Sequence, residues 1–211
     1  KYLRKVKFPD ISSARAKIKE NADILSFYGM TQFIYPYIAD NYSDLEFDLD
    51  KIRIATLDIE VECENGFPNP LEAVERVNAI TLKYDNMYTV LGLGDWENTN
   101  ESLSHLNIKY YKCTSEIELL KSFLNLWEAA DIDIVTGWNV NQFDMSYLVN
   151  RITKILGENN TKKLSPWGIV DRIQKNIRGQ LQEQVNILGI TIVDYLDLYR
   201  KFTYVTRESY R

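Results

Sequence analysis

The feature that most constrains the fold is a mostly apolar run that leads into two carboxylates. Residues 52–57 (Ile-Arg-Ile-Ala-Thr-Leu) are followed directly by Asp58, Ile59 and Glu60. Side chains alternate between the two faces of a strand, so Asp58 and Glu60 share one face while Ile59 enters the opposite, buried layer. The run therefore predicts a central strand over 52–61 with an acidic surface on one side.

A second acidic position lies 84 residues beyond Glu60. Asp144 follows a turn-like segment, 136–143, and by itself is typical of a helix cap. Two carboxylates on one sheet face repel each other unless a cation lies between them, and carboxylate oxygens suit Mg²⁺ and Mn²⁺. Asp58, Glu60 and Asp144 are therefore candidate catalytic residues and ligands for two Mg²⁺ or Mn²⁺ ions, the chemistry of phosphodiester hydrolysis. The single histidine, His105, cannot build a zinc site.

The order of predicted elements favours a mixed α/β sheet flanked by helices. Alternation and β-branched residues predict strands over 77–84, 87–93, 107–113, 132–136 and 191–193. One helix is predicted to begin at Ser115, a second to span 144–156 and end at Gly157, and a third to span 194–201. The first of these helices has an apolar face made of Leu119, Leu120, Phe123, Leu124 and Trp127.

Two further segments have weaker patterns. Residues 169–173 and 182–187 flank a polar tip that contains Gly179, which predicts a projecting β-hairpin, and 158–168 reads as a loop. Residues 1–50 read as a small α+β appendage. It has a helix over 13–20 capped by Ser12 or Ser13, and short strands over 31–35 and 37–39.

Charge and composition exclude some classes of protein. The net charge of −5 argues against indiscriminate DNA binding, although residues 150–211 carry 11 Lys and Arg against 6 Asp and Glu. That basic part is either a strand-binding flank or, as charge alone favours, an ordinary solvated surface. No apolar run reaches membrane-spanning length, so no membrane partner is expected. Cys63 and Cys113 suggest no disulfide framework, which makes the cytoplasm the simplest location.

The residues around these acids form longer motifs. Phe67-Pro68-Asn69-Pro70 follows the first acidic pair, and Thr136-Gly137-Trp138-Asn139 precedes Phe143-Asp144 and Tyr147-Leu148. Together they resemble the first two exonuclease motifs of family B DNA polymerases, especially those of T-even-type phages. The resemblance continues through 155–158, 165–166 and 194–202, so it covers nearly the whole chain in the right order.

The resemblance implies an RNase H-like (DnaQ-like) fold and a 3′→5′ proofreading exonuclease that acts on single-stranded DNA or a primer 3′ end. Residues 1–50 would be part of the polymerase N-terminal domain and 51–211 the exonuclease domain. The predicted hairpin matches one that helps to move a primer end between two active sites. By position, Asp58, Glu60 and Asp144 match metal ligands, whereas Asn139, Phe143 and Phe67 match positions near the terminal nucleotide. The location implied is the cytoplasm of an infected host cell, if the chain is phage-encoded.

One motif of the family has no counterpart in this chain. The third exonuclease motif is Tyr-x-x-x-Asp, and none of the 14 tyrosines is followed four residues later by Asp. Asp194 and Asp197 match a different segment and read as a cap and an exposed helical acid. The chain therefore reads as truncated before this motif, with weak or no exonuclease activity alone. The remaining polymerase chain is a candidate partner.

Two alternatives stay open at this point. The chain could be a catalytically incomplete module that binds nucleic acid or a partner, with Trp138, Phe143, Tyr147 and Trp167 stacking on bases. For most of these four, burial in an aromatic core is the preferred interpretation. A free-standing nuclease of the same fold is disfavoured by the absent third motif.

Overall fold

The protein is described by a computed structural model that covers residues 4, 6–27, 33–64, 66–177 and 180–203. The chain forms two compact units, residues 1–48 and 49–211. The interpretation of the first unit as part of a polymerase N-terminal domain stays a prediction.

The first unit contains two helices in its described residues. Helix α1 spans Ile11–Glu20, and its N-cap is Asp10, whose carboxylate accepts from the Ser13 N–H at 2.7 Å. The predicted cap at Ser12 or Ser13 is therefore wrong, because the charged carboxylate of Asp10 is available one turn earlier.

Helix α2 spans Ile34–Asn41, where short strands were predicted. The predicted strand over 37–39 is wrong, and the described part of 31–35 is a turn and the start of this helix. Pro36 lies in the first helical turn, where its missing N–H interrupts no intrahelical hydrogen bond. The described residues of the first unit are thus helical rather than α+β.

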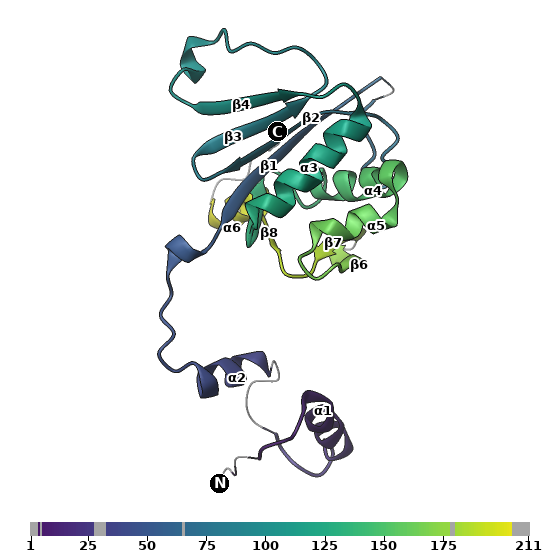
Figure 1. Ribbon diagram of the computed structural model, residues 1–211. Helices are drawn as coiled ribbons and strands as arrows, with labels where there is room; N and C mark the ends of the chain where they lie inside the picture. Colours follow the sequence, from purple (N-terminus) through teal and green to yellow (C-terminus); the bar gives the residue numbers. More distant parts are fainter. Residues whose placement is uncertain (1–3, 5, 28–32, 65, 178–179, 204–211) are drawn as a thin grey trace. The chain divides into compact units, whose positions relative to one another are not determined.

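The second unit is built on a six-stranded mixed sheet with the order β4-β3-β2-β1-β5-β8 (Figure 1). Strand β1 pairs antiparallel with β2 and parallel with β5, β2 pairs antiparallel with β3, and β3–β4 and β5–β8 are parallel. The strands are β1 Ile54–Val61, β2 Val77–Tyr84, β3 Met87–Gly92, β4 Asn107–Lys112, β5 Ile134–Gly137 and β8 Thr191–Asp194. The mixed α/β sheet predicted from the sequence is confirmed.

Helices α3 (Glu116–Ala130) and α4 (Asp144–Leu156) pack on the apolar side of the sheet (Figure 1). Ser115 caps α3 and Gly157 ends α4 at φ 86°, both as predicted. All five residues of the predicted apolar face of α3 are buried. Helix α6 (Tyr195–Phe202) follows β8, and the 3₁₀ turns are η1 Leu49–Lys51, η2 Glu101–Leu103 and η3 Lys162–Leu164.

The segment 158–168 was predicted to be a loop, but it contains α5 (Glu158–Thr161) and η3. Contacts with α3 and α4 hold it in place: Trp127 Nε1 donates to the Leu164 carbonyl at 2.9 Å, and the Thr153 and Thr161 hydroxyls lie 2.8 Å apart. Such contacts leave no local pattern in the sequence, which explains the wrong prediction.

The predicted hairpin is confirmed as β6 (Val170–Ile177) paired with β7 (Gln180–Ile187). Its predicted tip at Gly179 lies outside the described residues. The base of the hairpin does not simply project, because Val185 and Ile187 are buried in the core of the second unit. Among the described residues, no helix is long and apolar enough to cross a membrane.

Candidate active site

Strand β1 presents the first acidic pair as its alternation predicts. Ala55, Leu57 and Ile59 are buried in the core, whereas Asp58 and Glu60 are exposed on the other face. The pKa of the Asp58 carboxyl is raised because its surroundings remove part of its hydration. Both predicted ligands on β1 therefore share one sheet face.

Asp144 is the first residue of α4, and its side chain is almost fully buried, with 4% of its surface exposed. Its Oδ1 accepts from the backbone N–H of Ile59 at 3.0 Å. The pKa of Asp144 is raised to about 7: burial is the largest cause, the negative charge of Asp58 adds to it, and the hydrogen bond from Ile59 opposes both. The structure thus brings two of the three predicted acids, Asp58 and Asp144, together.

The turn between β5 and α4 is held by Asp194 at the end of β8. One carboxylate oxygen of Asp194 accepts from the Asn139 N–H at 3.1 Å and from the Leu196 N–H at 2.9 Å. The other accepts from the Asn141 N–H at 3.0 Å. Sequence reasoning predicted Asp194 only as a helix cap; its second role follows from the parallel pairing of β5 with β8.

Gly137 lets this turn approach β1 closely. A Cβ added at Gly137 would lie 2.5 Å from the Leu57 carbonyl oxygen and 3.0 Å from Val140 Cβ. Only a residue without a side chain fits there, and Leu57 directly precedes Asp58. The glycine therefore keeps the β5–α4 turn against the acidic strand.

Two predicted nucleotide-contacting residues lie against each other next to the acids. The ring centroids of Phe67 and Phe143 are 5.0 Å apart, and Phe143 directly precedes Asp144. Phe67 is 74% exposed and Phe143 is half-buried. Asn139, the third predicted residue, lies in the same turn with a left-handed φ of 60°. Asn139 and Phe143 thus share one turn, and Phe67 joins them from the β1–β2 connection.

The four aromatic residues considered above for base stacking differ in their burial. Tyr147 is fully buried and Phe143 packs against the core, so the preference for core positions is confirmed for these two. It is wrong for Trp138 and Trp167, which are 41% and 69% exposed. The Trp138 ring lies 6.0 Å from the Tyr195 ring and 5.6 Å from the Tyr199 ring, centroid to centroid.

The donor set fits a hard divalent cation in its chemistry. Asp58 and Asp144 are close enough for one charge to raise the pKa of the other acid, and a cation would relieve that repulsion. Among the described residues, no three Asp, Glu, His or Cys side chains are grouped closely enough to hold a metal ion. Glu60 shares the face of Asp58 but is not part of such a cluster, so its role as a ligand stays a prediction.

A six-stranded mixed sheet flanked by helices, with these acids on β1 and at the start of α4, is an RNase H-like fold of the exonuclease type. The chain belongs to the exonuclease domain of DNA polymerase family B, whose family model matches residues 16–211. Exonuclease domains of this family generally depend on divalent metal ions.

Individual relatives agree with this assignment. The chain is 34% identical to the DNA-directed DNA polymerases of Escherichia phage RB69 and Enterobacteria phage T4, over 96% and 97% of its length. It is 30% identical over 55% of its length to the DNA polymerase catalytic subunit of equine herpesvirus 2, of which it covers 12%. The chain spans 25% of the length of each of the two phage relatives.

Proposed function

We propose that this chain is a 3′→5′ proofreading exonuclease domain of a replicative DNA polymerase. In this proposal Asp58, Glu60 and Asp144 hold divalent metal ions. The supporting observation is the buried Asp144 carboxyl, which the Ile59 N–H holds beside Asp58 and whose pKa is raised to about 7. A cation bound beside both acids would offset the desolvation and the repulsion together.

Each side chain has a distinct task in this proposal. Bound Mg²⁺ or Mn²⁺, two ions in a complete site, supplies the activation of water and the stabilisation of the leaving 3′ oxygen. The carboxylates supply oxygen ligands. Phe67 and Phe143 offer ring surface to the terminal base, and Asn139 offers an amide for hydrogen bonding to the same nucleotide. The products are deoxynucleoside 5′-monophosphates.

The partners follow from the same assignment. The substrate is single-stranded DNA or a primer 3′ end, and the remainder of a polymerase is a protein partner. Two relatives are phage polymerases, so we place this domain in the cytoplasm of an infected host cell.

A Mn²⁺ titration by calorimetry tests the metal site. We expect the Asp58→Asn and Asp144→Asn variants each to lose at least about tenfold in Mn²⁺ affinity, because even the loss of a group that only hydrogen-bonds a metal ligand typically costs about 10–100-fold. Binding at pH 6.5 should release protons, because Asp144 is then partly protonated. Asp197→Asn on α6 is the matched control, since this acid is exposed and pairs with Arg200 of the same helix. Equal affinities in all four proteins would contradict the proposal.

A trimming assay separates catalysis from binding alone. Any shortening of single-stranded DNA by this chain should require Mn²⁺ or Mg²⁺, release 5′-monophosphates and disappear in Asp144→Asn. A catalytically incomplete binding module would instead retain the DNA with the same affinity in the presence and absence of the metal. That result, with no trimming, would favour the alternative function.

A further inference from the structure

The connection between β1 and β2, residues 62–76, carries Phe67 yet contains no strand or helix in its described part. The Glu62 N–H donates to the Arg76 carbonyl at 2.9 Å, which closes the connection at its base. Beyond that bond, its path over α4 depends on side chains of α4 that bind its backbone carbonyls. The stretch that follows Phe67, from Pro70 to Glu75, is therefore held by side chains of α4.

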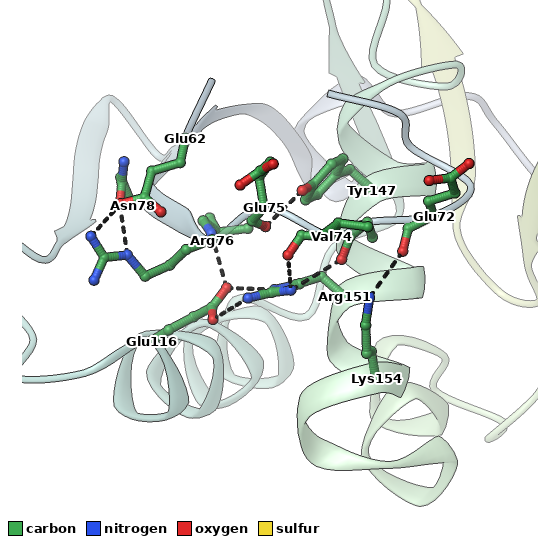
Figure 2. Close-up of polar contacts among 12 residues, drawn as sticks. Glu62, Glu72, Val74, Glu75, Arg76, Asn78, Glu116, Tyr147, Arg151 and Lys154 are labelled. Carbon is green, nitrogen blue, oxygen red and sulfur yellow. Dashed lines mark hydrogen bonds and ion pairs between the residues drawn. The ribbon is translucent and has the colours of Figure 1, made fainter. Parts of the chain in front are cut away.

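Arg151 makes the densest set of these contacts (Figure 2). Its Nη1 donates to the carbonyls of Ala73 at 3.1 Å and Val74 at 2.7 Å. Its Nε and Nη2 each donate to one carboxylate oxygen of Glu116, both at 2.7 Å. Glu116 also accepts from the Val77 N–H at 2.9 Å. The guanidinium thus joins α4 to the start of α3 and to the end of the connection, and Glu116 extends this link to the start of β2.

Three more residues on α4 extend this contact along the helix. Tyr147 and Lys154 lie four residues before and three residues after Arg151, and Asn150 lies three residues after Tyr147 and four before Lys154. The remaining hydrogen bonds are Tyr147 Oη to the Glu75 carbonyl at 2.6 Å, Asn150 Nδ2 to the Pro70 carbonyl at 2.9 Å and Lys154 Nζ to the Glu72 carbonyl at 3.4 Å. We call the four residues Tyr147, Asn150, Arg151 and Lys154 the carbonyl clamp.

The central ion pair of the clamp is buried. Only 9% of the Arg151 side chain and 10% of the Glu116 side chain are exposed. The Glu116 carboxylate raises the pKa of Arg151, so the guanidinium stays charged. A buried ion pair contributes little net stability. Its geometry is nevertheless specific, because only the planar guanidinium of arginine can donate to a carboxylate and to two carbonyls at the same time.

The clamp connects the two segments that carry the Phe67–Phe143 contact. Phe143 and Asp144 begin the helix that carries the clamp, and Phe67 lies on the connection that the clamp holds. Arg151 lies seven residues beyond Asp144, about two helical turns. A change at Arg151 therefore reaches the Phe67–Phe143 contact through the β1–β2 connection, on which neither Asp58 nor Asp144 lies.

We propose that Arg151 is a positioning residue, which sets the Phe67–Phe143 contact beside the acidic pair by clamping the β1–β2 connection to α4. Its effect on nucleotide binding rests on the proposed function, whereas its effect on Phe67 does not.

Fluorine NMR tests the positioning directly. The chain has eight phenylalanines, so uniform labelling with 4-fluorophenylalanine gives one resonance for each, assigned by single Phe→Leu variants. Arg151→Lys should shift the Phe67 and Phe143 resonances and leave that of Phe123, in the core of α3, in place. Arg53→Lys is the matched control, because Arg53 pairs with the exposed Asp131 at 3.0 Å, away from the connection.

A second variant covers the case in which Arg151→Lys does not fold. Tyr147→Phe removes only the hydrogen bond to the Glu75 carbonyl and keeps the ring in the core. It should shift the same two resonances by a smaller amount. Unchanged Phe67 and Phe143 resonances in the folded variants would overturn the proposal.

Kinetics supply a result that a merely structural role would not produce. In the trimming assay, Arg151→Lys should raise KM about tenfold with kcat nearly unchanged, because the acids stay in place while the base-contacting surface moves. Loss of folded protein alone would lower kcat and leave KM constant, and that pattern would overturn the proposal. If the unaltered chain neither trims DNA nor binds Mn²⁺ through Asp58 and Asp144, the proposed function fails, while the fluorine experiment still decides the role of Arg151.

Discussion

Asp144 Oδ1 accepts from the Ile59 N–H at 3.0 Å, and this hydrogen bond joins the first residue of α4 to β1 next to Asp58. The contact places a buried acid beside a second carboxyl. The position of the Asp144 carboxylate therefore depends on one backbone donor, the N–H of Ile59.

This arrangement predicts an unusual dependence of stability on pH. The pKa of Asp144 is about 7 in the folded state and near its model-compound value of 3.8 when unfolded. Between these values the folded chain binds more protons than the unfolded chain, so the free energy of unfolding falls as the pH rises from about 4 to about 7. The loss is on the order of 4 kcal/mol, from 1.36 kcal/mol per pKa unit.

The Asp144→Asn variant should remove most of this dependence and be more stable than the unaltered chain at pH 8 without metal. Urea denaturation at intervals from pH 4 to pH 8 measures the free energy of unfolding of both proteins. Glu128→Gln, on the exposed side of α3, should keep the original slope. A slope in Asp144→Asn equal to that of the unaltered chain would show that Asp144 titrates normally.

Asp194→Asn should loosen the turn that carries Asn139 and Phe143. The amide keeps one acceptor oxygen but places an NH₂ group where the Asn141 N–H now donates. We expect a loss of about 1–3 kcal/mol in the free energy of unfolding, the usual cost of an unmade buried hydrogen bond. Urea denaturation followed by circular dichroism measures this loss. Asp197→Asn on α6 should change stability little, and a similar loss there would argue against a specific role of Asp194.

Features that depend on residues close together in the sequence could be predicted. The alternation from Ile54 to Val61, the cap at Ser115 and the helix end at Gly157 each depend on neighbouring residues, and all three appear in the structure. The approach of Asp144 to Asp58 was predicted from the motifs, since neither acid alone is distinctive.

Features that depend on contacts between distant segments could not be read in this way. Arg151 looks like any helical cation, yet its partner Glu116 is 35 residues away. Asp194 holds a turn more than 50 residues earlier in the chain. A local pattern records which residues are polar, whereas the pairing of strands and helices decides which polar residues meet.

Gly137→Ala should destabilise the second unit through a steric clash at the same turn. The new methyl group would meet the Leu57 carbonyl oxygen at 2.5 Å, and overpacking of this kind costs about 1–3 kcal/mol. Because Leu57 adjoins Asp58, Mn²⁺ affinity should fall as well. Gly94→Ala is a matched control, since a Cβ there meets nothing within 4 Å. Equal urea midpoints for the two variants would mean that the turn relaxes freely.

Phe67→Ala should weaken binding of single-stranded DNA without affecting the fold. Phe67 is 74% exposed and contacts the half-buried Phe143 ring, so its loss removes little packing. Stacking of one base on an aromatic ring contributes about 1–3 kcal/mol, so we expect a rise of about 5–150-fold in Kd. Fluorescence anisotropy of a labelled oligonucleotide in Ca²⁺, which we expect to occupy the site without supporting cleavage, measures this.

The control is Phe202→Ala, which removes a phenylalanine that is 69% exposed at the end of α6. Its Kd should stay within about twofold of the unaltered chain, as is usual for surface substitutions outside a binding site. Equal weakening by both variants would indicate a general loss of apolar surface. Weakening by Phe67→Ala alone places the terminal base at the Phe67–Phe143 pair, next to the acids that the hydrogen bond from Ile59 to Asp144 brings together.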